Sequence, residues 1–297
     1  MNKFTRNLIE QRIQEVKEKG SKPERKDILQ TFIDSIDEKT GSKMNIKEIV
    51  SENMALIFAG TDTASNTMSW TLFLLMVYPE VYKKVVQEIR STFPDQGQSI
   101  KYNEARTKLS YLEAVIYESM RYIPAVPSGL GRKVPKGNGI GLQGYKIPSG
   151  ADVYIFIHGI HRNPKYWDKP DKFIPERFMG EGAADRKRNV FTFSTGYRIC
   201  PGRNLAWAEI FLTLSNLLRD YDFELPEESQ FGPNVIDPET GDPQIMPGFL
   251  GLTLGPKYIK RDGWAIVKPA DLSSYSTTNN GSVSNAVEKA SSRADKV

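Results

Sequence analysis

The longest uninterrupted helical pattern in the sequence runs from Asn45 to Tyr78 and ends directly before Pro79. Most residues between Met54 and Met76 are apolar or small, which favours a buried helix in the centre of a domain. A helix of this length crosses a whole domain. The rest of the fold must therefore be arranged around this one helix.

Shorter helical patterns surround the central one, and β-rich runs are confined to the second half of the chain. Helices are expected over Lys3–Lys19, Lys26–Asp37, Pro79–Phe93, Tyr102–Lys108, Ser110–Tyr122 and Asn204–Leu218. Short strands are expected over Gly139–Leu142, Gly144–Ile147 and Asp152–Ile157. Residues 161–178 are interpreted as a loop, 180–188 as a polar connection, and 271–297 as a disordered tail rich in Ser and Asn. The predicted fold class is mainly α with small β-sheets.

Composition and charge exclude several classes of protein. With 39% apolar and 26% charged residues the chain is expected to be globular, and a net charge of +4 is too small to indicate a nucleic-acid partner. Its single cysteine, Cys200, excludes an internal disulfide framework and a zinc site built on several thiolates. No segment has the ~20 apolar residues that span a bilayer, and residues 1–20 do not resemble a signal peptide, so a soluble chain is expected.

Cys200 lies in the segment Phe193-Ser-Thr-Gly-Tyr-Arg-Ile-Cys-Pro-Gly202, which runs directly into a predicted helix. The N–H groups at a helix start stabilise a thiolate. Gly196 and Gly202 allow unusual backbone angles and the close approach of a flat, bulky group. Because a lone cysteine is more commonly a small buried apolar residue, the spacing around it has to decide between the two interpretations.

The spacing Phe193-x-x-Gly196-x-Arg198-x-Cys200-x-Gly202 is complete, and it resembles the signature loop of the cytochrome P450 family. The resemblance implies that Cys200 is the axial thiolate ligand of the iron in haem b (iron protoporphyrin IX). Phe193 would shield the sulfur, Arg198 would pair with a haem propionate, and both glycines would border the cofactor.

Glu118 and Arg121 are three residues apart on a predicted helix, so they share one face. Taken alone, such a pair is usually a solvated surface bridge. In the P450 family a pair with this spacing is buried and is completed by a second arginine. Arg177, in the segment Pro175–Phe178, matches that position. The resemblance therefore implies a structural role for all three residues.

The central helix contains Ala59-Gly-Thr-Asp-Thr63. On the residues alone, Gly60 weakens the helix and the Thr63 hydroxyl can bond back to the carbonyl of Ala59, which favours a kink. The resemblance implies that Ala59 and Gly60 leave room for dioxygen beside the haem, and that Asp62 and Thr63 are the catalytic acid–alcohol pair that relays protons. Ala64 departs from the family, since many members carry a second hydroxyl there.

The connection after residue 123 resembles the family strand that borders the substrate. It implies that Arg132 contacts a haem propionate and that four residues line the substrate pocket, namely Ala125, Val126, Pro127 and Ser128. His158 and His161 are the two histidines. We expect both in a strand-to-loop segment, where structural roles are favoured over a metal site.

These motifs occur in the family's order, and the resemblance covers about residues 3–268. It implies a partial haem domain over residues 1–270, formed by the C-terminal portion of the cytochrome P450 fold with the N-terminal portion missing. The implied activity is insertion of one oxygen atom from O₂ into a lipophilic organic substrate. Electrons would come from an NADPH-dependent flavoprotein reductase, and family members of this type are commonly on the endoplasmic reticulum membrane.

Two alternatives stay open at this point. One is a haem-thiolate isomerase or dehydratase, which the pair Asp62–Thr63 disfavours, and the other is a truncated remnant that binds haem weakly or not at all. The basic run Arg186–Arg188 is a candidate for docking an acidic reductase surface, although a solvated loop explains it equally well.

Overall fold

The computed structural model describes residues 2–19 and 27–272. They form two units, the first ending at Thr63 and the second beginning at Ala64. The long helix α3 (Ile46–Val77) contributes its first half to one unit and its second half to the other. The expected tail is described only at residues 271 and 272, and the rest of it lies outside the described residues.

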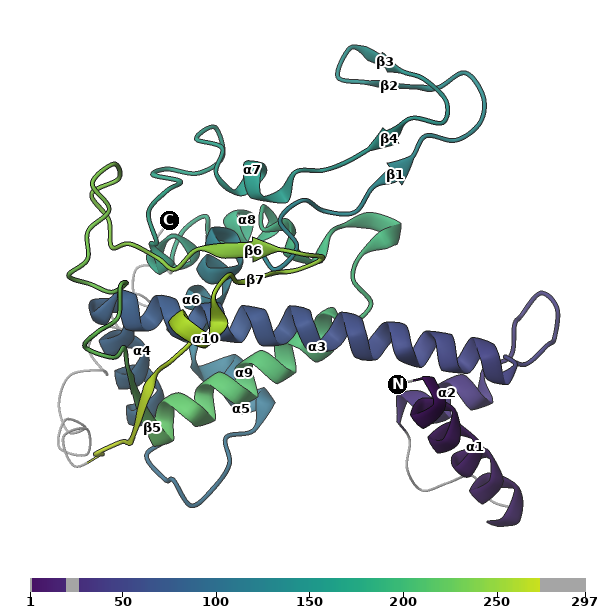
Figure 1. The fold of residues 1–297 in the computed structure, drawn as a ribbon, viewed down its shortest axis with the longest axis horizontal. Helices are drawn as coiled ribbons and strands as arrows, with labels where there is room; N and C mark the ends of the chain where they lie inside the picture. The colour runs from purple at the N-terminus through teal and green to yellow at the C-terminus, as the bar shows by residue number, and fades with distance from the viewer. Residues whose placement is uncertain (1, 20–26, 273–297) are drawn as a thin grey trace, which may run out of the picture. The chain divides into compact units, whose positions relative to one another are not determined.

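The first unit packs α1 (Asn2–Lys19) and α2 (Ile28–Asp34) with the start of α3 (Figure 1). Its small core is formed by the buried side chains Ile9, Ile49 and Val50. Asp27 begins α2 by accepting a hydrogen bond from the Gln30 amide at 2.9 Å. The same carboxylate also pairs with Arg12 of α1 at 3.2 Å. One side chain therefore both caps a helix and joins two helices.

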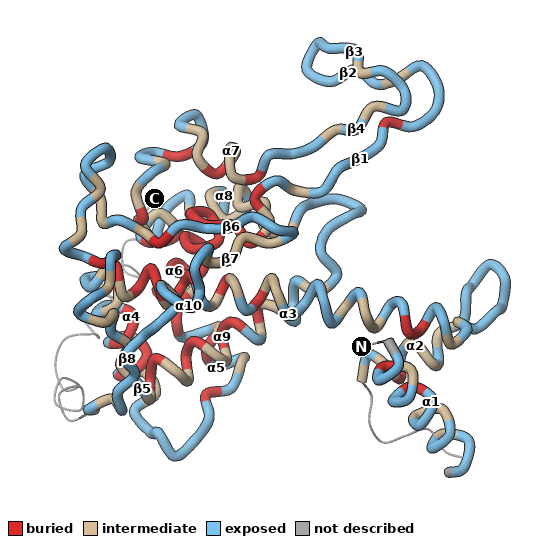
Figure 2. Tube along the Cα trace, in the orientation of Figure 1, coloured by how far each residue is buried: buried red, intermediate tan, exposed pale blue. Residues whose placement is uncertain are grey.

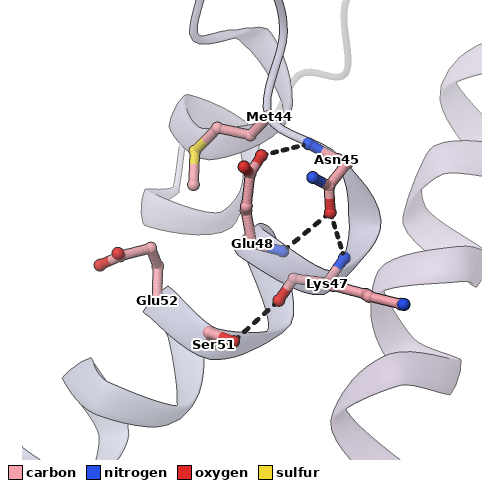
Figure 3. Close-up of a pocket in the computed structure, with 6 residues that line it drawn as sticks. All are labelled: Met44, Asn45, Lys47, Glu48, Ser51 and Glu52. Carbon is pink, nitrogen blue, oxygen red and sulfur yellow. Dashed lines mark hydrogen bonds between the residues drawn. The ribbon is translucent and has the colours of Figure 1, made fainter.

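A reciprocal cap starts α3 (Figure 3). The Asn45 side chain accepts hydrogen bonds from the amides of Lys47 and Glu48 at 2.9 and 3.1 Å. The Glu48 carboxylate accepts one from the Asn45 amide at 2.7 Å. The shallow surface depression lined by Met44, Asn45, Lys47, Glu48, Ser51 and Glu52 is thus a helix start whose capping groups, at Asn45 and Glu48, are already paired.

The core of the second unit is formed by the second half of α3 and by α4 (Pro79–Thr92), α6 (Ser110–Tyr122) and α9 (Arg203–Asp220). α6 is buried along nearly its whole length, with Glu113 as the exception after Ser110 (Figure 2). α4 contacts both α6 and α9, and α5 (Tyr102–Lys108) lies against α9. This arrangement places α6 inside the core and the start of α9 near the surface.

Short elements complete the second unit. The remaining helices and 3₁₀ turns are α7 (Ile157–His161), η1 (Pro175–Phe178), α8 (Ala183–Arg188), η2 (Phe191–Phe193), η3 (Gly196–Arg198) and α10 (Ile259–Asp262). The strands are β1 (Arg132–Lys133), β2 (Ile140–Leu142), β3 (Tyr145–Ile147), β4 (Asp152–Val153), β5 (Tyr221–Glu224), β6 (Gly248–Leu250), β7 (Leu254–Pro256) and β8 (Ile266–Pro269). Within the described residues they form the two-stranded antiparallel sheets β1–β4, β2–β3, β5–β8 and β6–β7. The sheets β1–β4 and β2–β3 lie on one mostly exposed arm (Figure 2).

The β6–β7 hairpin is attached to α3 and to the chain that follows α6. The Trp70 indole donates to the Leu254 carbonyl at 2.9 Å, and the Asn66 amide donates to the Thr253 hydroxyl at 3.1 Å. The Leu254 amide donates to the Ala125 carbonyl at 2.8 Å. These bonds join three segments that are far apart in the sequence.

The structure confirms the fold class, and α6 agrees with its expected bounds at both ends. The central helix is also confirmed, but its burial is not, because Ile57 and Phe58 are half exposed and the buried stretch begins at Ala64. The expected helix Lys26–Asp37 is shorter, since α2 ends at Asp34.

Two expectations in the second half of the chain are wrong. The strand expected over Asp152–Ile157 ends at Val153, and Ile157 begins α7, so His158 and His161 lie on a short helix. Residues 183–188 of the expected polar connection form α8, because good helix formers follow Gly182, whose positive φ of 72° turns the chain. In the described part of the chain no helix is both long and apolar enough to cross a membrane.

Glu88 of α4 provides a test of how α6 is held. Its carboxylate accepts hydrogen bonds from the Tyr111 and Leu112 amides at 2.8 and 2.9 Å, which caps the start of α6. We expect Glu88→Ala to lower the free energy of unfolding by about 1–2 kcal/mol. Urea denaturation followed by tryptophan fluorescence measures this loss, because all four tryptophans lie in the second unit. Glu80→Ala, at an exposed position of α4, is the control and should change stability by less than ~0.5 kcal/mol; equal losses would contradict the capping role.

Candidate active site

A fully buried carboxylate, Glu118, lies at the base of the candidate site. Arg121 holds it with two hydrogen bonds, Nε to Oε2 at 2.7 Å and Nη2 to Oε1 at 2.8 Å. Arg177 of η1 donates from Nε to Oε1 at 3.1 Å, and the Ile174 amide donates to the same oxygen at 2.7 Å. Glu118 and Arg121 have no exposed side-chain surface. The sequence-predicted trio is therefore brought together as expected, and burial makes both cations necessary.

The two arginines also hold the backbone of the segment that precedes η1. Arg121 donates from Nη1 to the carbonyls of His161 and Pro170 at 2.9 and 2.7 Å, and from Nη2 to that of Lys172 at 2.9 Å. Arg177 donates from Nη1 to the Asp168 carbonyl at 2.8 Å. One ionic cluster thus orders a stretch of irregular chain, because its guanidinium groups have donors to spare.

His161 connects this ordered stretch to the cysteine segment. Its side chain is fully buried, and its Nε2 accepts a hydrogen bond from the Phe191 amide at 3.0 Å. Burial, reinforced by the nearby charge of Arg121, lowers the pKa of His161 to about 3. The ring is therefore neutral near pH 7. Since Nε2 accepts, the ring proton must lie on Nδ1.

The cysteine segment folds back on itself. The Cys200 amide donates to the Phe193 carbonyl at 2.8 Å, and the Ser194 amide donates to the Phe191 carbonyl at 2.8 Å. Ser194 and Gly196 have positive φ angles of 60° and 69°. This backbone forms a closed loop of residues 191–200, called the cysteine loop below, whose last residue precedes α9.

Side chains of the cysteine loop point mostly into the open. Cys200, Arg198 and Tyr197 are exposed, while Phe193 is half buried and lies against Trp207 with ring centroids 6.2 Å apart. The Arg203 guanidinium lies 5.9 Å from the centre of the Phe193 ring. The loop therefore combines a supported inner face with an exposed face that presents the thiol.

Gly196 of the cysteine loop and Gly202, the N-cap of α9, differ in backbone conformation. Gly196 needs its positive φ of 69°, which is unfavourable for other residues. Gly202 has an ordinary φ of −82°, and a Cβ built there would lie 3.9 Å from the Cys200 sulfur, an ordinary contact. The chain's own atoms thus explain Gly196 but give no reason for glycine at position 202. The expectation that Gly202 borders a cofactor stays a prediction.

The donor set of this loop suits one kind of metal group. Among the described residues there is no group of three or more His, Cys, Asp or Glu side chains that could hold a metal ion. A bare ion would need several such ligands. Haem brings four nitrogen ligands of its own and needs one axial ligand from the protein, which a single exposed thiol at a helix start can supply. Cys200 and its loop therefore fit a haem.

Comparison with known proteins agrees with this geometry. The family model for cytochrome P450 matches residues 1–244. The chain belongs to the cytochrome P450 family. Among its relatives, cytochrome P450 monooxygenase helB1 of Aspergillus fumigatus is 39% identical over 236 residues, covering 80% of this chain and 40% of that protein. Cytochrome P450 2L1 of Panulirus argus is 35% identical over 206 residues, covering 68% of this chain and 41% of that protein.

Solved P450 structures have the same fold as this chain. It matches the haem domain of cytochrome P450DA with a TM-score of 0.74 and 22% identity, over 92% of this chain and 54% of that one. A second P450 structure, CYP102L1, matches with a TM-score of 0.72, over 90% of this chain and 56% of that one. The chain spans 40%, 47% and 45% of three fungal relatives. The structure is thus a partial cytochrome P450 fold.

The remaining predicted site residues lie in several places. Ala59, Gly60, Asp62 and Thr63 belong to the first unit, and the cysteine loop belongs to the second, so their joint action on one ligand stays a prediction. Thr63 does donate to the Ala59 carbonyl at 2.7 Å, as expected.

Arg132 lies on β1, where its Nη1 donates to the carbonyls of Leu130 and Gly131 at 3.0 Å. Its contact with a propionate stays a prediction. Of the four predicted pocket residues, Ala125 and Pro127 are buried, Val126 is half buried and Ser128 is exposed.

Sequence reasoning missed two features of this P450 site. His161 received only a general structural role, because no local pattern marks a ring whose partner is an amide thirty residues later. The β6–β7 hairpin was not singled out either, although its Leu254 bonds to the predicted pocket residue Ala125. Both depend on tertiary contacts. The alternation of small and apolar residues in the hairpin gives no signal of them.

The basic run Arg186–Arg188 is paired within the chain. Arg186 donates to the carbonyls of Arg177 and Glu181, Lys187 pairs with Glu113 at 2.6 Å, and Arg188 pairs with Asp185. Only Arg188 is largely exposed among the three. These contacts give the run an internal function and weaken the hypothesis that it docks a reductase.

The buried trio generates a stability prediction. Glu118→Gln leaves Arg121 and Arg177 buried without their anion, so we expect the free energy of unfolding to fall by about 3–5 kcal/mol. Glu224→Gln is the matched control, because Glu224 forms an exposed pair with Lys268 and should cost less than ~1 kcal/mol. Urea denaturation at pH 7 measures both. Similar losses for the two variants would mean that burial of the trio does not matter.

A second prediction concerns pH. Burial raises the pKa of the Glu113 carboxyl, but Lys187 and Arg106 outweigh this effect and hold its pKa below the usual 4.5. A lowered pKa in the folded state adds stability above pH 4.5, and this is lost as pH falls through the folded pKa. Glu113→Gln should therefore cost roughly 1 kcal/mol at pH 7, and the difference from the parent should shrink below pH 4.5. Denaturation at a series of pH values tests this, and a cost that is independent of pH would contradict it.

Proposed function

We propose that this chain is part of a haem-thiolate monooxygenase that inserts one oxygen atom from O₂ into a lipophilic organic substrate. The proposal includes haem b as cofactor and an NADPH-dependent flavoprotein reductase as electron donor. Its main support is the Cys200 thiol, presented on an exposed loop whose backbone is anchored to the buried trio. The named P450 monooxygenases among the relatives support the same reaction class.

Residues of the second unit would bind and orient the cofactor. Cys200 would bind the iron as a thiolate, stabilised by the N–H groups at the start of α9. Phe193, held against Trp207, would exclude water from the sulfur. Arg198 and Arg132 would pair with the propionates, as guanidinium groups do with carboxylates. When bound, haem supplies an iron centre at which oxygen is activated.

Residues of α3 would supply protons. The Thr63 hydroxyl already donates to the Ala59 carbonyl at 2.7 Å, and in the proposal it would hold a proton at Oγ1 for delivery to the reaction site. The neighbouring Asp62 carboxyl would replace that proton. Ala59 and Gly60 would leave space beside them, since no atom lies within 4 Å of a Cβ built at Gly60. The acid–alcohol pair favours a monooxygenase over an isomerase or dehydratase, which needs no such proton delivery.

The decisive experiment uses the purified chain loaded with haem, reduced and exposed to carbon monoxide. We expect an absorption band at the position of thiolate-ligated haem, and we expect Cys200→Ser to abolish it, because a hydroxyl does not replace a thiolate as ligand. Thr195→Ala, at an exposed position of the same loop, is the control and should keep the band.

Each other outcome identifies an alternative. An unchanged band in Cys200→Ser would refute the ligand assignment. No band in the parent chain would identify a remnant that does not hold haem competently. Consumption of an organic hydroperoxide with product formation, in the absence of NADPH, would instead favour the isomerase or dehydratase.

A further inference from the structure

His161 joins the buried trio to the cysteine loop through two different atoms. Its carbonyl oxygen accepts a hydrogen bond from Arg121 at 2.9 Å, and its ring nitrogen Nε2 accepts one from the Phe191 amide at 3.0 Å. Arg121 is itself fixed by Glu118. A displacement of His161 would therefore also move Phe191, the first residue of the loop.

The His161 ring has little freedom to move. It is fully buried and meets the Trp167 ring edge to face, with centroids 6.4 Å apart and planes at 84°. The Trp167 indole donates to the carbonyl of Ile160 at 3.1 Å, and this bond holds Trp167 against α7. Nε2 accepts from the Phe191 amide, and this bond is the ring's polar contact with the cysteine loop. The ring therefore acts on the loop through one atom.

The contact at Phe191 is passed on to the thiol by backbone bonds. The Phe191 carbonyl accepts from the Ser194 amide at 2.8 Å, and the Phe193 carbonyl accepts from the Cys200 amide at 2.8 Å. Thr192 adds a second tether, its hydroxyl donating to the Met120 carbonyl at 3.3 Å. Because the loop's outer side chains are exposed, these polar contacts rather than apolar packing define its shape.

We propose that His161 is a positioning residue for the cysteine loop: its ring nitrogen Nε2 anchors the Phe191 amide so that Cys200 is held in the geometry that binds iron. The proposal rests on the proposed function only for the identity of the ligand. The connection from Arg121 through His161 to Phe191 depends only on the two hydrogen bonds at His161.

Two substitutions separate the hydrogen bond from the bulk of the ring. His161→Leu fills similar space but has no acceptor, so the half-buried Phe191 amide loses its partner. His161→Gln restores an acceptor at about the distance of Nε2 from the backbone. Ile89→Ala is the control for general loss of stability. Ile89 is a fully buried residue of α4 and takes part in none of the hydrogen bonds that hold the loop.

Hydrogen exchange of the Phe191 and Cys200 amides, measured by mass spectrometry on loop peptides, is the first readout. We expect His161→Leu to speed exchange about tenfold or more at both amides, beyond the change that Ile89→Ala causes. His161→Gln should restore most of the protection. The second readout is the share of carbon monoxide absorption at the thiolate position in haem-loaded protein, which His161→Leu should reduce and His161→Gln should recover.

Equal exchange in His161→Leu and Ile89→Ala, or no recovery in His161→Gln, would overturn the positioning role. The exchange readout needs no haem, so its failure can be told from failure of the proposed function. Should the parent chain show no thiolate band, the proposed function fails while the exchange experiment still decides the role of His161.

Discussion

The structure depends on the neutralisation of one carboxylate that has no access to water. An ionised group removed from water costs several kcal/mol, and Glu118 recovers this only through Arg121, Arg177 and the Ile174 amide together. Replacing such a cluster by apolar residues often costs little stability, so its value lies in fixing positions. Here the spare donors of both guanidiniums fix carbonyls between residues 161 and 172, a stretch with little regular structure.

Because polar contacts fix the backbone in this way, the cysteine loop can be both exposed and ordered. Apolar burial cannot hold residues 194–200, since their side chains face outward. Their shape comes from a backbone bond between Cys200 and Phe193, from positive φ angles, and from the anchor on His161. A metal ligand needs this combination, because its geometry must be fixed while its outer face stays open to the cofactor.

Sequence alone predicted the parts of this molecule that have local signatures. Pro79 marks the end of α3, and the spacing of Glu118 and Arg121 places them on one face of α6. Arg177 could be assigned only by resemblance, since its partner is 59 residues away. His161 and α7 were missed for the same kind of reason. Their structure is decided by an amide and a guanidinium from distant segments, and neither leaves a periodic pattern in the chain.

The contacts that shape the thiol side of the site all lie within the second unit. Every bond from Glu118 to Cys200 described above joins residues between 118 and 200, whereas Asp62 and Thr63 belong to the first unit. In the proposal the two groups have different tasks, since residues of the second unit hold the thiol and residues of α3 deliver protons. A defect in proton delivery would then leave the spectrum of the thiolate intact, and a defect in the loop would alter that spectrum first.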